Sequence, residues 1–191
     1  MLAGIPAEPM YAEFAKIGPA LTDGRLSMAE GYLHILRTCG AEPRPELARA
    51  LVDRGMQLLL DNGRLFGDVL PFMAGVRARG IKIAIVSNCD EQARSLLGWL
   101  GVSSLADALV LSCEVGAAKP AARIFERALE SLGVHAEAAL FVDDNPDYCA
   151  AAAALGIRTA RIVRGEPGKD VAAGGAAVVG SLAEVEEMLS A

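Results

Sequence analysis

The sequence lacks the features that would place the protein at a membrane or on a nucleic acid. It has no apolar run of the roughly 20 residues that a membrane-spanning helix needs. It has no basic cluster, and its formal net charge of −6 opposes binding to a polyanion. Residues 1–6 lack the basic segment and the long apolar run of a signal peptide. We therefore expect a cytoplasmic protein that binds neither a membrane nor a nucleic acid.

Cysteine and histidine are also scarce, and neither forms a pattern that binds a metal. The four cysteines have no CxxC spacing and stand apart in the sequence: Cys39, Cys89, Cys113 and Cys149. Because no secretion signal accompanies them, we expect reduced thiols, and for Cys89 and Cys113 small buried ones. His34 and His135 have no local partner at metal-ligand spacing, so we expect surface or packing residues.

What the sequence does contain is enough apolar material for one core. Its 191 residues fit one domain, or one core with an inserted subdomain, and the 53% that are apolar exclude a disordered chain. Up to residue 65 every pattern is helical. Ser27 and Glu30 form a capping box, which marks a helix start. We predict helices over 9–17, ended by Gly18-Pro19, from Ser27 to Gly40, and from Pro45 to Asn62.

After Phe66, apolar runs alternate with helical patterns. The runs that favour strands are 81–86, 108–111, 138–142, 157–163 and 176–179. Strands that alternate with helices indicate βαβ units, and hence a parallel sheet with helices on both faces. We therefore predict an α/β protein with a Rossmann-like core over 66–191 and a helical subdomain over 1–65. The low-complexity stretch 164–175 is expected to be a surface loop.

Polar side chains stand where these strands end. Ser87, Ser112 and Asp143 each end a strand, and Lys119 begins the helix after the second one. Because right-handed crossovers bring the carboxyl ends of parallel strands to one edge, these groups should converge. The adjacent carboxylates Asp143 and Asp144 repel each other unless a cation lies between them. A strand end followed by an ordinary helix cap is the alternative, but the convergence favours a site for phosphate and a metal.

Three stretches resemble motifs of the haloacid dehalogenase superfamily, and they occur in the order that this family has. Ile85–Asn88 resembles its second motif, Lys119-Pro120 its third, and Phe141–Asp144 its fourth. The resemblance covers residues 66–165. The helical subdomain ahead of it resembles the cap that subfamily I inserts between its first motif and the rest of the core.

The resemblance implies a chemistry and assigns residues to it. It implies an aspartate nucleophile that forms an aspartyl-phosphate with a small phosphorylated metabolite. Ser87 and Asn88 would bind the phosphate of this substrate. Lys119 would act as a catalytic residue that neutralises the phosphoryl group, while Asp143 and Asp144 would hold Mg²⁺. Such a hydrolase is a Mg²⁺-dependent phosphatase. In the dehalogenase branch the nucleophile attacks carbon instead and requires no metal.

The first motif of the family, an apolar strand that ends in Asp-x-Asp ahead of the cap, is absent from the sequence. Asp23, Asp61 and Asp68 are ordinary turn and cap aspartates. In the family this strand is the centre of the sheet, so its absence would leave the strands that end at Ser87 and Asp143 with unpaired inner edges. Either a strand and helix of about 25–30 residues belong ahead of the first residue, or the protein is a catalytically silent binding module with this fold.

For the chain of 191 residues we expect no Mg²⁺-dependent hydrolysis of a generic aryl phosphate, because it carries no aspartate nucleophile on a strand. The absorbance of the released aryl alcohol, compared with a protein-free control, checks this. Turnover that is lost in Lys119→Ala would contradict the prediction and show that another residue supplies the nucleophile.

Overall fold

The computed structural model describes residues 5–165 and 177–189, and the chain divides into two compact units. The first unit contains Met1–Arg64, Ser87–Leu100 and Leu111–Ala118, and the second contains Leu65–Val86, Gly101–Val110 and Lys119–Ala191. The expected surface loop lies, from residue 166 on, outside the described residues. Among the described helices, none combines the length and the apolarity that crossing a membrane requires.

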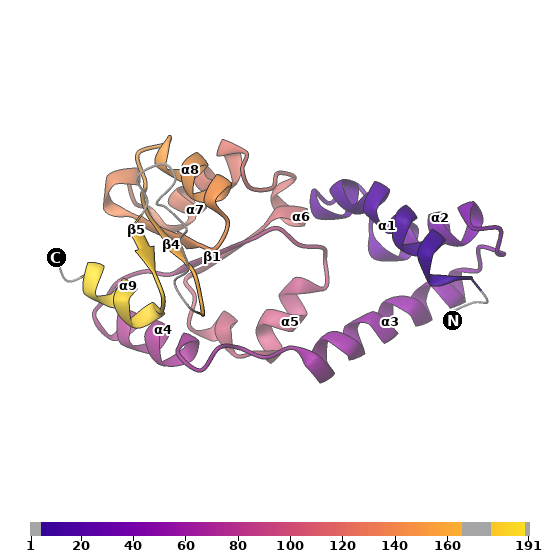
Figure 1. Ribbon diagram of the computed structural model, residues 1–191, viewed down its shortest axis with the longest axis horizontal. Coiled ribbons are helices and arrows are strands. Elements are labelled where there is room, and N and C mark those ends of the chain that lie inside the picture. Colours follow the sequence, from indigo (N-terminus) through magenta and orange to yellow (C-terminus); the bar gives the residue numbers. More distant parts are fainter. Residues whose placement is uncertain (1–4, 166–176, 190–191) are drawn as a thin grey trace. The chain divides into compact units, whose positions relative to one another are not determined.

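The first unit is built mainly from helices. These are α1 (Ala7–Thr22), α2 (Met28–Thr38), α3 (Pro45–Asn62), α5 (Ala93–Trp99) and α6 (Ser112–Val115) (Figure 1). Helix α2 packs against both α1 and α3, and α3 also packs against α5. Helix α2 buries Ile35 and Leu36, and helix α3 buries Leu51. The helical pattern of the sequence up to residue 65 is therefore confirmed.

Helix α1 is longer than the sequence predicts. The pattern places its end at Gly18-Pro19, but the helix continues to Thr22 with the proline inside it. Tertiary packing explains the difference. At Gly31 of α2, an added methyl group would lie 3.1 Å from the side chain of Ile17 and 3.2 Å from that of Leu21. Because these side chains stand on either side of the proline, their packing against α2 offsets the hydrogen bond that proline cannot donate.

The start of α2 confirms the predicted capping box. The backbone N–H of Glu30 donates to Oγ of Ser27 at 3.3 Å, and the backbone N–H of Ser27 donates to Oε2 of Glu30 at 2.9 Å. The Ser27 hydroxyl also donates to Oε2 of Glu30 at 2.6 Å, and this bond, together with the one from the Ser27 backbone, lowers the pKa of the Glu30 carboxyl group. The backbone N–H of Met28 donates to Glu91 at 2.7 Å, which joins this helix start to the segment that follows Ser87.

The second unit alternates strands and helices, as the sequence predicts. Its helices are α4 (Val69–Ala78), α7 (Ala122–Leu132), α8 (Pro146–Ala153) and α9 (Leu182–Met188), with 3₁₀ helices at Val102–Ser104 and Ala136–Ala138. The strands are β1 (Ala84–Ser87), β2 (Ala108–Leu111), β3 (Leu140–Asp143), β4 (Arg158–Ile162) and β5 (Ala177–Val179) (Figure 1). The last residue of β1 and the last residue of β2 belong to the first unit. Every run that favours a strand contains one, although residue 176 of the last run lies outside the described residues.

The described strands form two sheets, where the sequence predicts one. Strands β3, β4 and β5 are parallel and lie in this order, with Asp143 of β3 in register with Arg161 of β4. Strands β1 and β2 form a separate two-stranded sheet. Among the strands that the structure describes, no hydrogen-bonded ladder joins β1 to β3. Strand β3 is therefore an edge strand, and its polar end stands at the edge of its own sheet.

Apolar packing fixes β3 just before this polar end. A buried cluster lies on the three-stranded sheet and helix α9: Ala160, Val179 and Val185. Helix α7 contributes Phe125, whose ring meets the ring of Phe141 edge to face with centroids 5.2 Å apart. Because Phe141 lies within β3, this contact restrains the strand that carries Asp143.

The turn after α1 contains a close backbone contact that only glycine allows. Gly24 has a φ of +74°, and a Cβ atom at this position would lie 2.0 Å from the carbonyl oxygen of Cys113. Gly40, after α2, has a similar φ of +77°, but nothing lies within 4 Å of its Cβ position. The two glycines therefore share a backbone conformation and differ in their surroundings.

We expect Gly24→Ala to lower the free energy of unfolding by more than Gly40→Ala does. Both changes introduce left-handed strain of roughly 1–2 kcal/mol, and only Gly24→Ala adds a collision with the Cys113 carbonyl. Urea unfolding followed by circular dichroism measures both losses. Equal losses in the two variants would contradict a close contact at Gly24.

Candidate functional site

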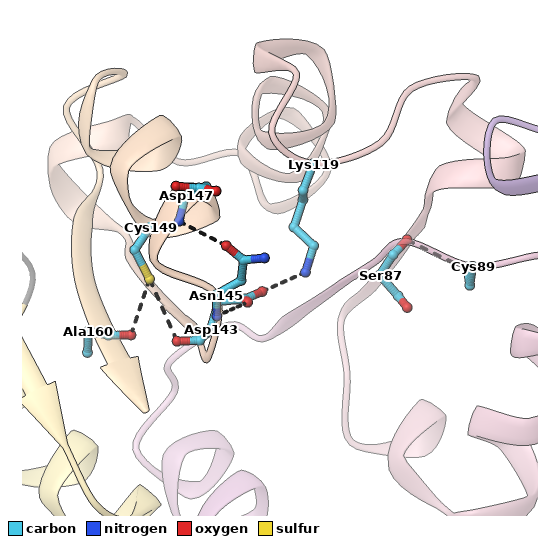
Figure 2. A network of polar contacts seen from close by, with 8 residues as sticks. All are labelled: Ser87, Cys89, Lys119, Asp143, Asn145, Asp147, Cys149 and Ala160. Atoms are coloured by element: carbon cyan, nitrogen blue, oxygen red, sulfur yellow. Dashed lines mark hydrogen bonds and ion pairs between the residues drawn. The ribbon is translucent and has the colours of Figure 1, made fainter. Parts of the chain in front are cut away.

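Asp143, which the sequence predicts as a metal ligand, stands at the carboxyl end of β3 with both carboxylate oxygens engaged. Its Oδ2 lies 2.6 Å from Nζ of Lys119, and its Oδ1 accepts a hydrogen bond from the backbone N–H of Asn145 at 2.9 Å (Figure 2). Lys119 lies ahead of α7 and is joined to Pro120 by a cis peptide bond. The structure thus brings the predicted lysine onto one of the predicted carboxylates.

The Lys119–Asp143 ion pair is buried. The side chain of Lys119 is 9% exposed and that of Asp143 is 10% exposed, and charges in such surroundings are stable only when they are paired. The rings of Phe141 and Tyr148 have their centroids 5.7 Å and 5.1 Å from the lysine Nζ, within the range of cation–π attraction. The ammonium group is therefore held by a carboxylate and by aromatic rings.

The sequence alone assigns neither aromatic ring to the site. Phe141 carries a signal that points to it, because it belongs to the same motif as Asp143. Tyr148 lies within α8, and its proximity to Lys119 depends on how this helix packs.

The segment after Asp143 is fixed by a helix cap and a buried thiol. The Asn145 side chain accepts a hydrogen bond from the backbone N–H of Asp147 at 2.9 Å, so the interpretation of this segment as a helix cap holds for Asn145 (Figure 2). The Cys149 thiol donates to the carbonyl groups of Asp143 and Ala160, at 3.7 Å and 3.8 Å. Burial raises the pKa of Cys149, which keeps this thiol protonated and able to donate. The end of β3 is thereby tied to α8 and β4.

The second predicted metal ligand, Asp144, is exposed, and its backbone carbonyl accepts a hydrogen bond from Nε of Arg161 at 3.1 Å. Across residues 5–165 and 177–189, no three or more His, Cys, Asp or Glu side chains gather in a way that could hold a metal ion. Mg²⁺ is commonly bound by one or two carboxylates together with substrate phosphate and water. The two hard carboxylates at the end of β3 therefore fit Mg²⁺ of this kind, and they do not fit a metal that needs a full protein cage.

The predicted phosphate-binding residues Ser87 and Asn88 belong to the first unit, whereas Lys119 and Asp143 belong to the second. Ser87 ends β1, as the sequence predicts, and its carbonyl accepts a hydrogen bond from the Cys89 thiol at 3.6 Å (Figure 2). The assignment of Ser87 and Asn88 to phosphate remains a prediction.

Ser112 is expected to join the converging polar groups, but its hydroxyl hydrogen-bonds to the backbone. It is fully buried, its Oγ donates to the carbonyl of Thr22 at 2.6 Å, and it accepts a hydrogen bond from the backbone N–H of Cys89 at 2.9 Å. The hydroxyl therefore joins the end of α1 to the segment after β1. Strand position alone cannot distinguish these two uses of a serine.

Comparison with known proteins gives a family and a set of relatives. A family model described as haloacid dehalogenase-like hydrolase matches residues 5–156. The chain is 33% identical over 107 residues to the phosphatase MT3486 of Mycobacterium tuberculosis, which covers 55% of this chain and 49% of that protein. It is 33% identical over 134 residues to the glyceraldehyde 3-phosphate phosphatase of Methanopyrus kandleri, covering 69% and 58%. The chain thus spans about half the length of the curated relatives it matches.

Solved structures agree on the fold. A 2-haloacid dehalogenase from Pseudomonas syringae superposes with a TM-score of 0.74 at 21% identity, covering 99% of this chain and 83% of that one. A HAD family enzyme from Bacteroides thetaiotaomicron, crystallised with magnesium and inorganic phosphate, superposes with a TM-score of 0.63 at 19% identity, covering 88% and 92%. These likenesses support an α/β fold with parallel strands and N-terminal helices.

We expect Lys119→Met to destabilise the protein by about 3–5 kcal/mol, because it leaves the Asp143 carboxylate buried without its partner. The matched control is Glu114→Gln, which breaks the ion pair between Arg94 and Glu114. That pair is short, at 2.6 Å, but its side chains are 53% and 44% exposed. An exposed pair contributes roughly 0–1 kcal/mol. Urea unfolding measures the free energy of unfolding of both variants. Similar losses in the two variants would contradict the expectation that the buried Lys119–Asp143 pair stabilises the protein more than the exposed pair does.

Proposed function

Because this chain belongs to the haloacid dehalogenase-like hydrolases, we propose that it supplies the phosphate- and metal-binding residues of a Mg²⁺-dependent phosphatase. Its substrate class would be a small phosphorylated metabolite. The observation that carries the proposal is the buried pair of Lys119 and Asp143 at the carboxyl end of β3. Relatives that are themselves phosphatases support this choice of reaction.

The role proposed for Lys119 follows from its surroundings. An ammonium group that is 9% exposed lies beside Asp143 and two aromatic rings. In a site with low water content, such a charge stabilises negative charge on phosphoryl oxygens much more strongly than it would in water. The rings and the carboxylate also restrict the lysine to one position, so it needs little reorganisation when phosphate binds. Lys119 is therefore proposed as the catalytic cation.

Asp143 and Asp144 are proposed to hold Mg²⁺, which when bound would neutralise charge on the transferred phosphoryl group. Asp143 is already fixed by the backbone N–H of Asn145, so its carboxylate is oriented before any ligand arrives. Asp144 is exposed and adjacent, and can complete a pair of carboxylates. Ser87 and Asn88 are proposed to donate hydrogen bonds to the phosphate, as the resemblance implies.

The nucleophile of the proposed reaction is an aspartate on a strand that this sequence does not contain. The family places that strand between the strands that end at Ser87 and Asp143. The described strands form two separate sheets, with no ladder between β1 and β3, which is consistent with an absent central strand in a Rossmann-like sheet. We infer that the active hydrolase needs this strand in addition to the residues present here.

The same absence favours a second candidate function, a catalytically silent module that binds a phosphorylated ligand without hydrolysing it. The two candidates share the phosphate and metal residues and differ in the nucleophile. A chain extended by a strand that ends in Asp-x-Asp should hydrolyse phosphate esters if the first candidate is right. In that extended protein, hydrolysis of a carbon–halogen bond that survives a metal chelator would indicate dehalogenase chemistry instead.

We expect Mg²⁺ binding in the presence of inorganic phosphate to weaken by at least about tenfold in Asp144→Asn, or ~1.4 kcal/mol. Titration calorimetry with magnesium chloride measures the affinity. Asp144 is the better test than Asp143 because its exposed side chain is not part of the buried ion pair. Its substitution should therefore leave the fold intact.

The matched control for this measurement is Asp147→Asn. Asp147 is also exposed and lies in the first turn of α8, so the two variants remove the same charge from neighbouring positions. Unchanged affinity in Asp147→Asn with a loss in Asp144→Asn would support the proposed ligand. Equal Mg²⁺ affinities in both variants and in the parent protein would show that Asp144 is not a metal ligand.

A further inference from the structure

Two cysteines that the proposed function does not use face each other in the first unit. Cys89 follows the end of β1, and Cys113 lies in the first turn of α6, so they come from separate segments of the sequence. Burial and, after it, the neighbouring Cys89 side chain raise the pKa of Cys113, so the two thiols lie close to each other. Both cysteines are half-buried free thiols, which leaves part of each residue accessible to small reagents.

The buried Ser112 hydroxyl holds these segments together. The backbone N–H of Cys89 donates to Oγ of Ser112 at 2.9 Å, and the carbonyl oxygen of Cys89 lies 3.2 Å from the same Oγ. Because Ser112 immediately precedes Cys113, the backbone of one cysteine is fastened next to the backbone of the other. The backbone at Gly24, in the turn after α1, also packs closely against the Cys113 carbonyl and so restrains the segment that carries Cys113.

We propose that Cys89 and Cys113 are an oxidation site, at which a hydroperoxide converts the thiol pair into an intramolecular disulfide. The geometry carries the proposal: two half-buried free thiols stand on segments whose backbones one serine hydroxyl holds next to each other. The inference does not depend on the proposed phosphatase reaction, because the disulfide is detected by mass and not by activity.

The reaction balances with hydrogen peroxide as the oxidant. The sulfur of Cys89 attacks one peroxide oxygen, the O–O bond breaks, and water leaves, which gives a sulfenic acid at Cys89. The sulfur of Cys113 then attacks the Cys89 sulfur, the S–O bond breaks, and the departing hydroxide takes the Cys113 proton to form a second water. Both thiols are oxidised and the peroxide is reduced.

The order of these steps follows from the surroundings of Cys113. Burial, together with the neighbouring Cys89, raises the pKa of Cys113 to about 11. This thiol therefore stays protonated at neutral pH and is a poor first nucleophile, because the thiolate is the reactive form. It is suited to the second step, in which its sulfur already lies against the sulfenic acid and its proton leaves with the hydroxide.

The disulfide would also act on the segment that carries the proposed phosphate-binding residues. Cys89 directly follows Asn88 and lies two residues after Ser87. A covalent bond to Cys113 would anchor the Ser87-Asn88-Cys89 segment to α6, in addition to the hydrogen bonds through Ser112. The cross-link also lowers the conformational entropy of the unfolded chain, so the urea midpoint of the oxidised protein should rise.

The test treats the full chain with hydrogen peroxide, removes the oxidant, alkylates remaining thiols with N-ethylmaleimide, and maps peptides by mass spectrometry without reduction. We expect a peptide that contains Cys89 linked to a peptide that contains Cys113, and its disappearance on treatment with dithiothreitol. Cys39 and Cys149 should carry the alkylating label or remain unmodified. The linked peptide should be lost in Cys89→Ser and in Cys113→Ser, and retained in the control variant Cys39→Ser.

The proposal is overturned if the oxidised wild-type protein carries alkylating label on both Cys89 and Cys113, or if either thiol proceeds to sulfinic acid without the linked peptide. It is also overturned if the linkage forms between molecules only, as a dimer on a non-reducing gel. A parallel experiment with the Cys89→Ala and Cys113→Ala pair, compared by circular dichroism, confirms that loss of the linkage comes from loss of sulfur and not from unfolding.

Discussion

The second unit depends on one buried ion pair, between Lys119 ahead of α7 and Asp143 at the end of β3. Neither charge would be stable in its surroundings alone, so each requires the other. Once the pair forms, it connects the start of one helix with the end of one strand. The contact between Phe125 and Phe141 and the hydrogen bond from the Cys149 thiol to the Asp143 carbonyl hold that strand in place. The same arrangement that stabilises the unit leaves a positive charge fixed beside the Asp143 carboxylate.

The first unit has a comparable centre in the hydroxyl of Ser112. It contacts the carbonyl of Thr22 at the end of α1 and the backbone of Cys89 after β1. A single small polar side chain, fully buried, therefore joins the N-terminal helices to the segment that follows Ser87 and Asn88. Because a buried hydroxyl without hydrogen-bond partners costs free energy, the burial of Ser112 depends on these contacts. The proximity of the Cys89 and Cys113 thiols is a consequence of this arrangement.

Much of the fold could be predicted from local patterns. The Ser27 capping box, the strand runs and the alternation with helices are set by side chains a few residues apart, and each is found where the pattern places it. The end of α1 could not, because the packing of Ile17 and Leu21 against Gly31 outweighs the break that Gly18-Pro19 favours. The candidate site shows the same division: the motif residues are recognisable in sequence, but the partner of each one depends on contacts across many residues.

By itself, the sequence determined the family, the order of the motifs, and the identity of Lys119, Asp143 and Asp144 as candidate site residues. The tertiary structure alone decided that Lys119 pairs with Asp143, that Tyr148 lies against the lysine, and that Ser112 serves the backbone. It also decided that the described strands form two sheets and that the segments of Cys89 and Cys113 are held together through Ser112. The physical reason is range. Periodicity and capping act within a few residues, whereas burial and charge pairing are settled only when segments far apart in the chain come into contact.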